Sequence, residues 1–172
     1  MPLCRSYLIT LVLIAPSIAL TFKAVRLRAL QDTPTAFGST YARESQLTDG
    51  DWVKRAAQWG GEKSAAYLAM DADVPCGIAA GLFDQDDATR ADLLSMWVAP
   101  THRRLGVGRT LVEAIFEWAQ ARGAMTLQLM VTSNNDAAIR FYERLGFART
   151  GRTEPYPNDP ALIEYEMSRL IL

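Results

Sequence analysis

The chain has 172 residues, with 18 Lys and Arg against 19 Asp and Glu, and 49% of it is hydrophobic. These values suit one soluble globular domain over residues 1–172 and exclude a disordered chain. The formal net charge of −1 argues against a nucleic-acid or membrane-surface partner, because such partners call for a basic protein. Two cysteines and one histidine favour reduced thiols in the cytoplasm and no metal site.

The first apolar run, residues 7–15, allows two interpretations. It follows Arg5, as the apolar part of a secretory signal would, but no Ala-x-Ala cleavage site follows Leu20. It is also shorter than the roughly 20 apolar residues of a membrane span. We favour a buried strand over residues 7–14, because a short run of large and β-branched apolar residues is typical of one.

The remaining elements are predicted from apolar periodicity, with Gly and Pro marking their ends. In chain order they are a helix over 17–30, a loop over 31–40, a helix starting after 48–51 and ending at 60–61, strands over 64–70, 76–83 and 92–98, a helix over 107–122, a strand over 125–131, a helix over 134–145, and short strands over 147–151 and 162–167 around a Pro-rich loop. This order predicts an α/β fold with a mixed, mostly antiparallel sheet of six to seven strands and helices on both faces.

The segment after the third of these middle strands combines glycines with arginines. Gly106 and Gly108 let the backbone approach a ligand, and the helix that begins there leaves its first N–H groups unpaired. Arg103, Arg104 and Arg109 add charged donors. This combination predicts a phosphate site, although it is neither a Walker A loop nor a dinucleotide fingerprint.

Two motifs stand in order here, separated by one predicted helix and one predicted strand. The first is Arg103-x-x-Gly106-x-Gly108, which resembles the acetyl-CoA pyrophosphate loop of the Gcn5-related N-acetyltransferase (GNAT) family. The second, which is similar to that family's other hallmark, is Asn135-x-x-Ala138-x-x-x-Tyr142-x-x-x-Gly146-Phe147. The resemblance is sharp over residues 93–147, and residues 36–41 also look like a loop of many bacterial members. Arg104 departs from it, since glycine is frequent there in relatives.

The resemblance implies a fold and a cosubstrate. Acetyl-CoA would lie in a V between two parallel strands that splay apart, here 92–98 and 125–131. The main-chain groups of Met96 and Val98 would pair with the pantetheine arm, and Trp97 is expected at the cofactor with them. The pyrophosphate would contact the loop residues Arg103, Arg104, Leu105, Gly106, Val107, Gly108, Arg109 and Thr110.

The resemblance also implies direct transfer of an acetyl group from acetyl-CoA to a primary amine in a ternary complex. Tyr142 matches the usual general acid, which would protonate the leaving thiolate, and its other interpretation is a core side chain. Asn135 would orient the cofactor or only cap its helix. Asp92 resembles an acidic residue that serves as the base in some relatives, and Glu44 is the alternative.

A non-catalytic acyl-CoA-binding module of the same fold is the alternative function. The acceptor would be a small-molecule or peptide amine, with Trp97, Tyr41 and Tyr156 as candidates for lining its pocket. An acidic pocket would suit polyamines or aminoglycosides and a hydrophobic one peptide N-termini, and the sequence does not choose between them. The resemblance leaves a homodimer open.

Overall fold

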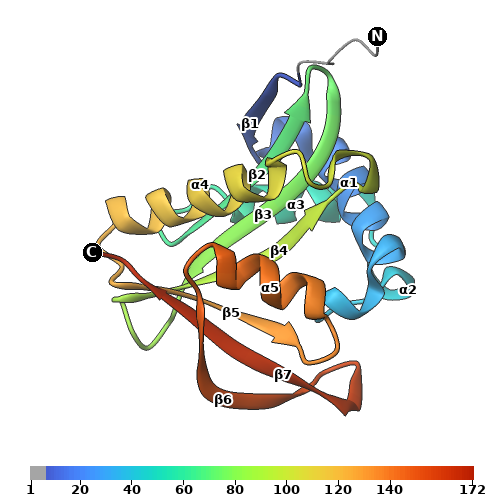
Figure 1. Ribbon diagram of the computed structural model, residues 1–172. Coiled ribbons are helices and arrows are strands. Elements are labelled where there is room, and N and C mark those ends of the chain that lie inside the picture. Colours follow the sequence, from blue (N-terminus) through green and yellow to red (C-terminus); the bar gives the residue numbers. More distant parts are fainter. Residues whose placement is uncertain (1–6) are drawn as a thin grey trace, which may run out of the picture.

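A seven-stranded mixed sheet runs through residues 7–172, which are the residues that the computed structural model describes (Figure 1). Its strand order is β1-β2-β3-β4-β5-β7-β6. The strands are β1 (Ile9–Leu13), β2 (Ser64–Asp71), β3 (Val74–Phe83), β4 (Arg90–Val98), β5 (Thr126–Thr132), β6 (Ala148–Tyr156) and β7 (Asp159–Leu170). Neighbouring strands are antiparallel except β4 and β5, which are parallel. The predicted fold class is confirmed.

Helices cover both faces of this sheet, and Figure 1 shows α4 in front of the strands and α3 behind them. They are α1 (Ala19–Asp32), α2 (Tyr41–Glu44), α3 (Asp49–Gln58), α4 (Val107–Ala121) and α5 (Asp136–Arg144), with short 3-10 turns at Pro16–Ile18, Pro34–Ala36 and Pro100–His102. Helix α3 begins as predicted, because Thr48 and Asp51 form a reciprocal capping box there. Helix α2 lies in a stretch for which the sequence predicted no helix.

The N-terminal apolar run forms the edge strand β1, which pairs with β2 in antiparallel register. The strand interpretation of this run is therefore confirmed for its described part, but the prediction that the strand is buried is wrong. Val12 and Leu13 are exposed, because β1 lies at the edge of the sheet and pairs on one side only. Cys4 and Arg5 lie outside the described residues. Within residues 7–172, no helix has the length and apolar character needed to cross a membrane.

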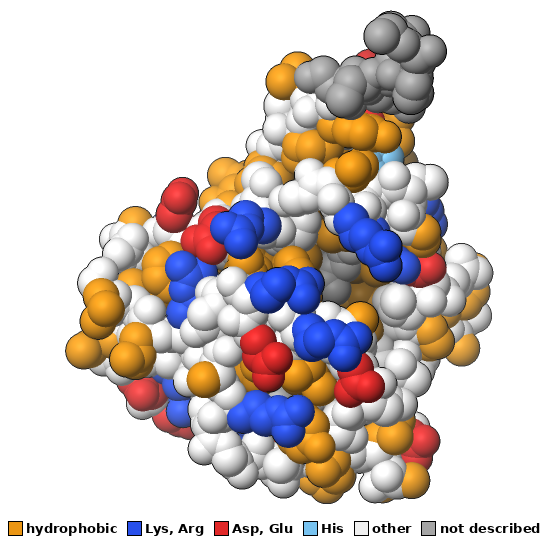
Figure 2. All heavy atoms as spheres, in the orientation of Figure 1, with side chains coloured by type: hydrophobic (Ala, Val, Ile, Leu, Met, Phe, Trp, Pro, Cys, Tyr) orange, Lys and Arg blue, Asp and Glu red, His pale blue; other side chains and the backbone are white. Residues whose placement is uncertain are grey.

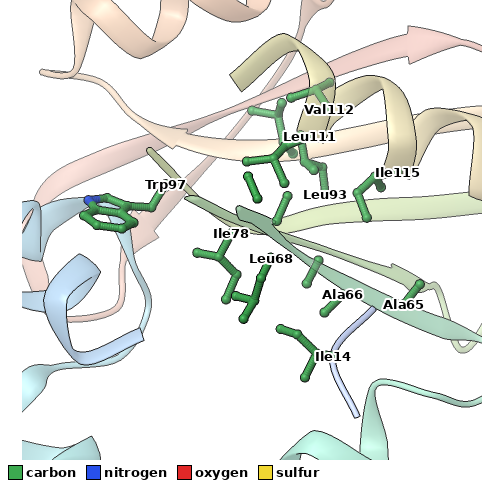
Figure 3. Packing of buried hydrophobic residues seen from close by; sticks show 14 of the residues in the cluster. Ile14, Ala65, Ala66, Leu68, Ile78, Leu93, Trp97, Leu111, Val112 and Ile115 are labelled. Carbon is green, nitrogen blue, oxygen red and sulfur yellow. The ribbon is translucent and has the colours of Figure 1, made fainter. Parts of the chain in front are cut away.

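The hydrophobic core lies on both sides of the central strands. Figure 3 shows Leu111 and Ile115 of α4 on one side of these strands and Leu68 and Ile78 on the other. All four side chains are at most 1% exposed, and burying each contributes about 1.5–3 kcal/mol. The helices are thereby held against a sheet that is apolar on both faces.

The C-terminal hairpin corrects the predicted Pro-rich loop. Strands β6 and β7 are much longer than the predicted short strands, and only a tight turn at residues 157–158 separates them. Pro155 lies within β6, which is the edge strand of the sheet, and Pro160 is the second residue of β7. Proline is tolerated at an edge or at a strand start, since no ladder N–H is needed there.

Strands β4 and β5 separate after a short paired stretch. Their register contains only the pairs Arg90↔Thr126, Ala91↔Leu127 and Asp92↔Gln128. Just beyond, β4 carries a bulge against β3, and Ser95 within it has a φ of 55°. A bulge adds a residue to one strand and increases its twist, which turns the rest of β4 away from β5.

Replacing the buried Leu111 tests the core assignment. We expect Leu111→Ala to lower the free energy of unfolding by about 2–5 kcal/mol, because the site is 0% exposed and the substitution leaves a cavity. The control is Leu20→Ala, also in a helix but 58% exposed, which should change it by less than about 1 kcal/mol. Urea unfolding measures both, and equal losses would contradict the assignment.

Candidate active site

An open cleft with a volume of about 680 Å³ lies where β4 and β5 separate. This volume is typical of a small-molecule site. Its lining includes Asp92, Leu93 and Met96 of β4, Leu129 to Thr132 of β5, Asn135, Ala138 and Tyr142 around α5, residues 36–39 of the loop after α1, and Glu154, Glu164 and Glu166 of the C-terminal hairpin. The structure thus brings together five of the predicted site residues: Glu44, Asp92, Met96, Asn135 and Tyr142.

The edge of β4 that faces this opening carries backbone groups without a strand partner. The Ala99 N–H donates to the Cys76 carbonyl of β3 at 2.8 Å. Because backbone groups alternate in direction along a strand, those of Met96 and Val98 face away from β3 and toward the opening. A ligand with amide groups could pair with them as an additional strand would.

The N-terminus of α4 presents unpaired amides beside the cleft. The first hydrogen bond of α4 runs from the Thr110 N–H to the Gly106 carbonyl at 3.0 Å, so the N–H groups of the first turn have no partner in the helix. Gly106 has a φ of 84° and Arg104 one of 64°. Such values favour glycine, so Arg104 adopts a conformation that residues with a side chain rarely take.

Gly108 lets this helix end sit close to its neighbours. A Cβ at Gly108 would lie 3.0 Å from Phe141 Cζ of α5 and 3.2 Å from Met96 Cε. Met96 lines the cleft, so the amides of α4 adjoin it, although the predicted loop residues 103–110 are not part of its lining. Figure 2 shows Lys and Arg side chains gathered on the face that carries α4 and α5, which adds to the partial positive charge of the helix end.

Arg103 and Trp97 bind protein groups instead of facing the cleft. The guanidinium of Arg103 forms an ion pair with Asp32, at the end of α1, and its Nε–H donates to the Val98 carbonyl at 3.0 Å. The indole N–H of Trp97 donates to the same Asp32 carboxylate at 2.9 Å, on the side of the sheet where Figure 3 shows the ring. Trp97 is 4% exposed and does not line the cleft, which argues against its predicted place in the acceptor pocket.

The sequence allowed two interpretations of Tyr142, a general acid or a core side chain, and its position in the structure is compatible with both. Its ring packs edge-on against Phe141 and Phe147, with centroid distances of 5.2 and 5.8 Å, and it also lines the cleft. Burial raises the pKa of the Tyr142 phenol well above its ordinary value. The hydroxyl therefore keeps its proton at neutral pH and can act as a donor.

Asn135 caps α5, since its side-chain oxygen accepts a hydrogen bond from the Ala138 N–H at 3.2 Å. It also lines the cleft. The amide nitrogen of this side chain is the group left to meet a ligand, so capping and binding are compatible in this residue.

Asp92 and Glu44, the two candidate bases, have different environments. Burial raises the pKa of Asp92, although a hydrogen bond from Gln128 at 2.7 Å partly opposes the shift. Burial also acts to raise the pKa of Glu44, but hydrogen bonds and charges, chiefly from Arg26, outweigh it and lower this pKa. A base needs a carboxylate that takes up a proton readily, so the structure favours Asp92 over Glu44.

Glu44 is instead the centre of a buried ion-pair network. It is 2% exposed, and its oxygens lie 3.0 Å from Arg26 Nη2 and 3.1 Å from Arg55 Nη1. Arg26 also donates to Ser95 Oγ at 3.3 Å, at the bulge of β4. The network therefore ties α1, α2 and α3 to the strand that opens the cleft.

Sequence reasoning missed the polar residues of the C-terminal hairpin. Glu154, Glu164 and Glu166 line the cleft, together with Thr132 at the end of β5. The alternation of Glu164 and Glu166 with apolar residues was a visible signal, because alternate residues of a strand share a face. Tyr156 is buried and donates to the Phe37 carbonyl at 2.6 Å, so it fastens this hairpin to the loop after α1, and neither it nor Tyr41 lines the cleft.

A sequence profile of the acetyltransferase (GNAT) family matches residues 27–147, more than half of the chain. The chain belongs to the GNAT family of acetyltransferases. The resemblance inferred from the two motifs is thereby confirmed. Within residues 7–172, no group of three or more His, Cys, Asp or Glu side chains is arranged to hold a metal ion.

Individual acetyltransferases also resemble the chain. Ribosomal protein bS18-alanine N-acetyltransferase of Salmonella typhimurium is 36% identical over 98 residues, which are 56% of this chain and 66% of that protein. The chain thus spans just under two thirds of this curated relative. A GNAT acetyltransferase from Streptococcus pneumoniae has a TM-score of 0.79 at 25% identity, over 96% of this chain and 100% of that one.

A further solved structure, yncA from Salmonella typhimurium with its cofactor acetyl-CoA, has a TM-score of 0.76 over 95% of this chain and 94% of that one. Its identity of 17% limits the likeness to the fold.

The Glu44 network predicts a pH-dependent stability. We expect Glu44→Gln to lower the free energy of unfolding by about 3 kcal/mol at neutral pH, because it removes one partner of a buried ion pair. The pKa of Glu44 lies below its ordinary value of 4.5, so its contribution is complete above that pH and is lost as the pH falls through the folded-state pKa. The gap between the free energies of unfolding of the unsubstituted protein and Glu44→Gln should therefore become smaller as the pH falls.

Urea unfolding at neutral pH and at successively lower pH below 4.5 measures this gap. The control is Glu62→Gln, at an exposed position, for which we expect little change at any pH. A gap for Glu44→Gln that stayed constant on acidification would contradict the assignment.

Proposed function

We propose that this GNAT protein, acting as one domain, transfers an acetyl group from acetyl-CoA to a primary amine by direct attack in a ternary complex. One observation carries the proposal: the cleft between the separated strands is lined by Tyr142, a phenol that keeps its proton, and by Asp92, a carboxylate that takes one up readily. A donor and an acceptor of protons on one cavity are what aminolysis of a thioester requires.

The groups that would hold acetyl-CoA fit its chemistry. The diphosphate is an anion, and unpaired amides at the N-terminus of α4 suit an anion. The pantetheine arm contains amides, and the outward backbone groups of Met96 and Val98 can pair with them. The Val98 carbonyl already accepts a bond from Arg103, which leaves the N–H of Val98 and both groups of Met96 for the ligand.

The reaction assigns a task to each side chain in the cleft. Acetyl-CoA would supply the acetyl group as a thioester. Asp92 accepts a proton from the incoming ammonium, directly or through water, which frees the lone pair that attacks the carbonyl carbon. Tyr142 donates its proton to the sulfur as the carbon–sulfur bond breaks, so the products are an amide and a thiol. The nitrogen loses a second proton as the amide forms, and this proton restores the Tyr142 phenol directly or through water. Asp92 then releases its proton to solvent, so the ammonium and the thioester give an amide, a thiol and one proton.

Removal of the Tyr142 hydroxyl tests the enzymatic proposal against the non-catalytic alternative. We expect Tyr142→Phe to lower kcat about 100-fold or more, because the departing thiolate loses its proton donor, while the Kd for coenzyme A stays nearly unchanged. Thiol release over a panel of amines and calorimetry with coenzyme A measure the two quantities. Tyr165→Phe, a phenol that does not line the cleft, is the matched control.

Three results would count against this reading. An unchanged kcat removes Tyr142 from the role of acid. Cofactor binding without thiol release from any amine favours the binding module. No detectable coenzyme A binding contradicts both.

The raised pKa of Asp92 predicts how kcat changes with pH on the acidic side, that is, the acidic limb of the pH–rate profile. A base works only when it is deprotonated, so kcat should rise with pH through the pKa of Asp92, which lies above its ordinary value of 3.8. Asp92→Asn should lower kcat by about 100-fold and abolish this limb. The control is Asp86→Asn, at an exposed position, which should keep the profile. A limb that survived in Asp92→Asn would assign the base elsewhere.

A further inference from the structure

The cleft has an excess of negative charge that its own arginines do not neutralise. Six carboxylates and four guanidinium groups line it. Glu44 is paired with Arg26 and Arg55, Asp84 with Arg90, and Glu154 and Glu166 with Arg152. In the described part of the chain, Asp92 and Glu164 form no ion pair. With Asp92 assigned to proton transfer, Glu164 is the carboxylate whose purpose is unexplained.

Strand register places Glu164 in a polar row on the sheet. It stands directly opposite Thr132 of β5 on one side and Glu154 of β6 on the other. Residues directly opposite one another project from the same face, so the three side chains are neighbours there. Burial, and then the charge of Glu154, raise the pKa of Glu164, as expected for a carboxylate that lacks a cation.

Thr132 supplies a second, independent observation. It lines the cleft and is 3% exposed. Its hydroxyl oxygen is buried and has no hydrogen-bond partner among residues 7–172. A buried hydroxyl without a partner is unfavourable by about 1–3 kcal/mol, and buried polar groups in native proteins are seldom left so. Its position next to Glu164 points to a donor that the chain itself does not provide.

We propose that the acceptor is a dicationic aliphatic amine, whose second ammonium group binds between the Glu164 carboxylate and the Thr132 hydroxyl. This inference rests on the proposed function, because the first amine of the same molecule is the one that is acetylated. An ammonium group has three donors and no acceptor, and both protein groups accept. An anionic acceptor would be repelled by the uncompensated negative charge of the cleft, and a monoamine would leave Thr132 and Glu164 unpaired.

The test compares amines that differ in the second charge. Putrescine and butylamine have carbon chains of the same length, but only putrescine carries a second ammonium group. We expect putrescine to have a kcat/KM about tenfold or more above that of butylamine, because a hydrogen bond to a charged group stabilises a complex by about that factor. A peptide with adjacent lysines offers the same two groups from another source. Whichever of the two dications has the higher kcat/KM identifies the source of the second ammonium group, and either order supports the proposal as long as putrescine exceeds butylamine.

Two variants locate the second ammonium group. Glu164→Gln should raise the KM for the dication about tenfold or more, with kcat and the KM for butylamine nearly unchanged. Thr132→Val should raise the same KM without lowering the midpoint of thermal unfolding, because the hydroxyl it removes has no partner in the described chain. The control is Glu117→Gln, at an exposed position of α4, which should change neither quantity.

Calorimetry with putrescine in the presence of coenzyme A separates failure of this inference from failure of the proposed function. Putrescine that binds, and binds more weakly to Glu164→Gln, supports the site even if no amine is acetylated. Equal kcat/KM for putrescine and butylamine, an unchanged dication affinity in both variants, or no putrescine binding would each overturn it.

Discussion

The separation of β4 from β5 is the constraint on which the rest of the site depends. Three paired positions hold the strands together, and the bulge at Ser95 then turns β4 away. Backbone polar groups inside a protein need partners, so an opened ladder either fills with water or takes a ligand with matching amides. The glycine at position 108 brings α4 against Met96 beside this opening, which places unpaired helix amides next to unpaired strand groups.

Arginine side chains near the cleft serve mainly to hold this opening in shape. Arg26 and Arg55 are bound to Glu44, and Arg103 is bound to Asp32 and to the end of β4. Because their charges are compensated by carboxylates, the positive charge left for an anion comes from the helix end and from exposed side chains. The negative charge left for a cation comes from Asp92 and Glu164. A chain with nearly equal numbers of acidic and basic residues can thus present opposite charge to the two ligands that we propose.

Sequence periodicity predicted the order of most elements, and its failures have local causes. Proline was taken to mark a loop after β6, although an edge strand tolerates it, so the hairpin of β6 and β7 was predicted too short. The glycine-rich loop and the second motif identified the family and placed Tyr142 and Asn135, because such motifs depend on neighbours along the chain. Trp97 was expected at the ligand, but strand alternation turns its side chain to the opposite side, where it meets Asp32.

By itself, the sequence determined the helices other than the short α2, most of the strands and the family, since apolar spacing, caps and glycine positions act over a few residues. Only the tertiary structure decided which carboxylates face the cleft. Glu154, Glu164 and Thr132 become neighbours through the register of three strands, and Arg103 meets a partner 71 positions away. Such pairings depend on how the sheet is assembled, because local spacing carries no information on which strand lies alongside another.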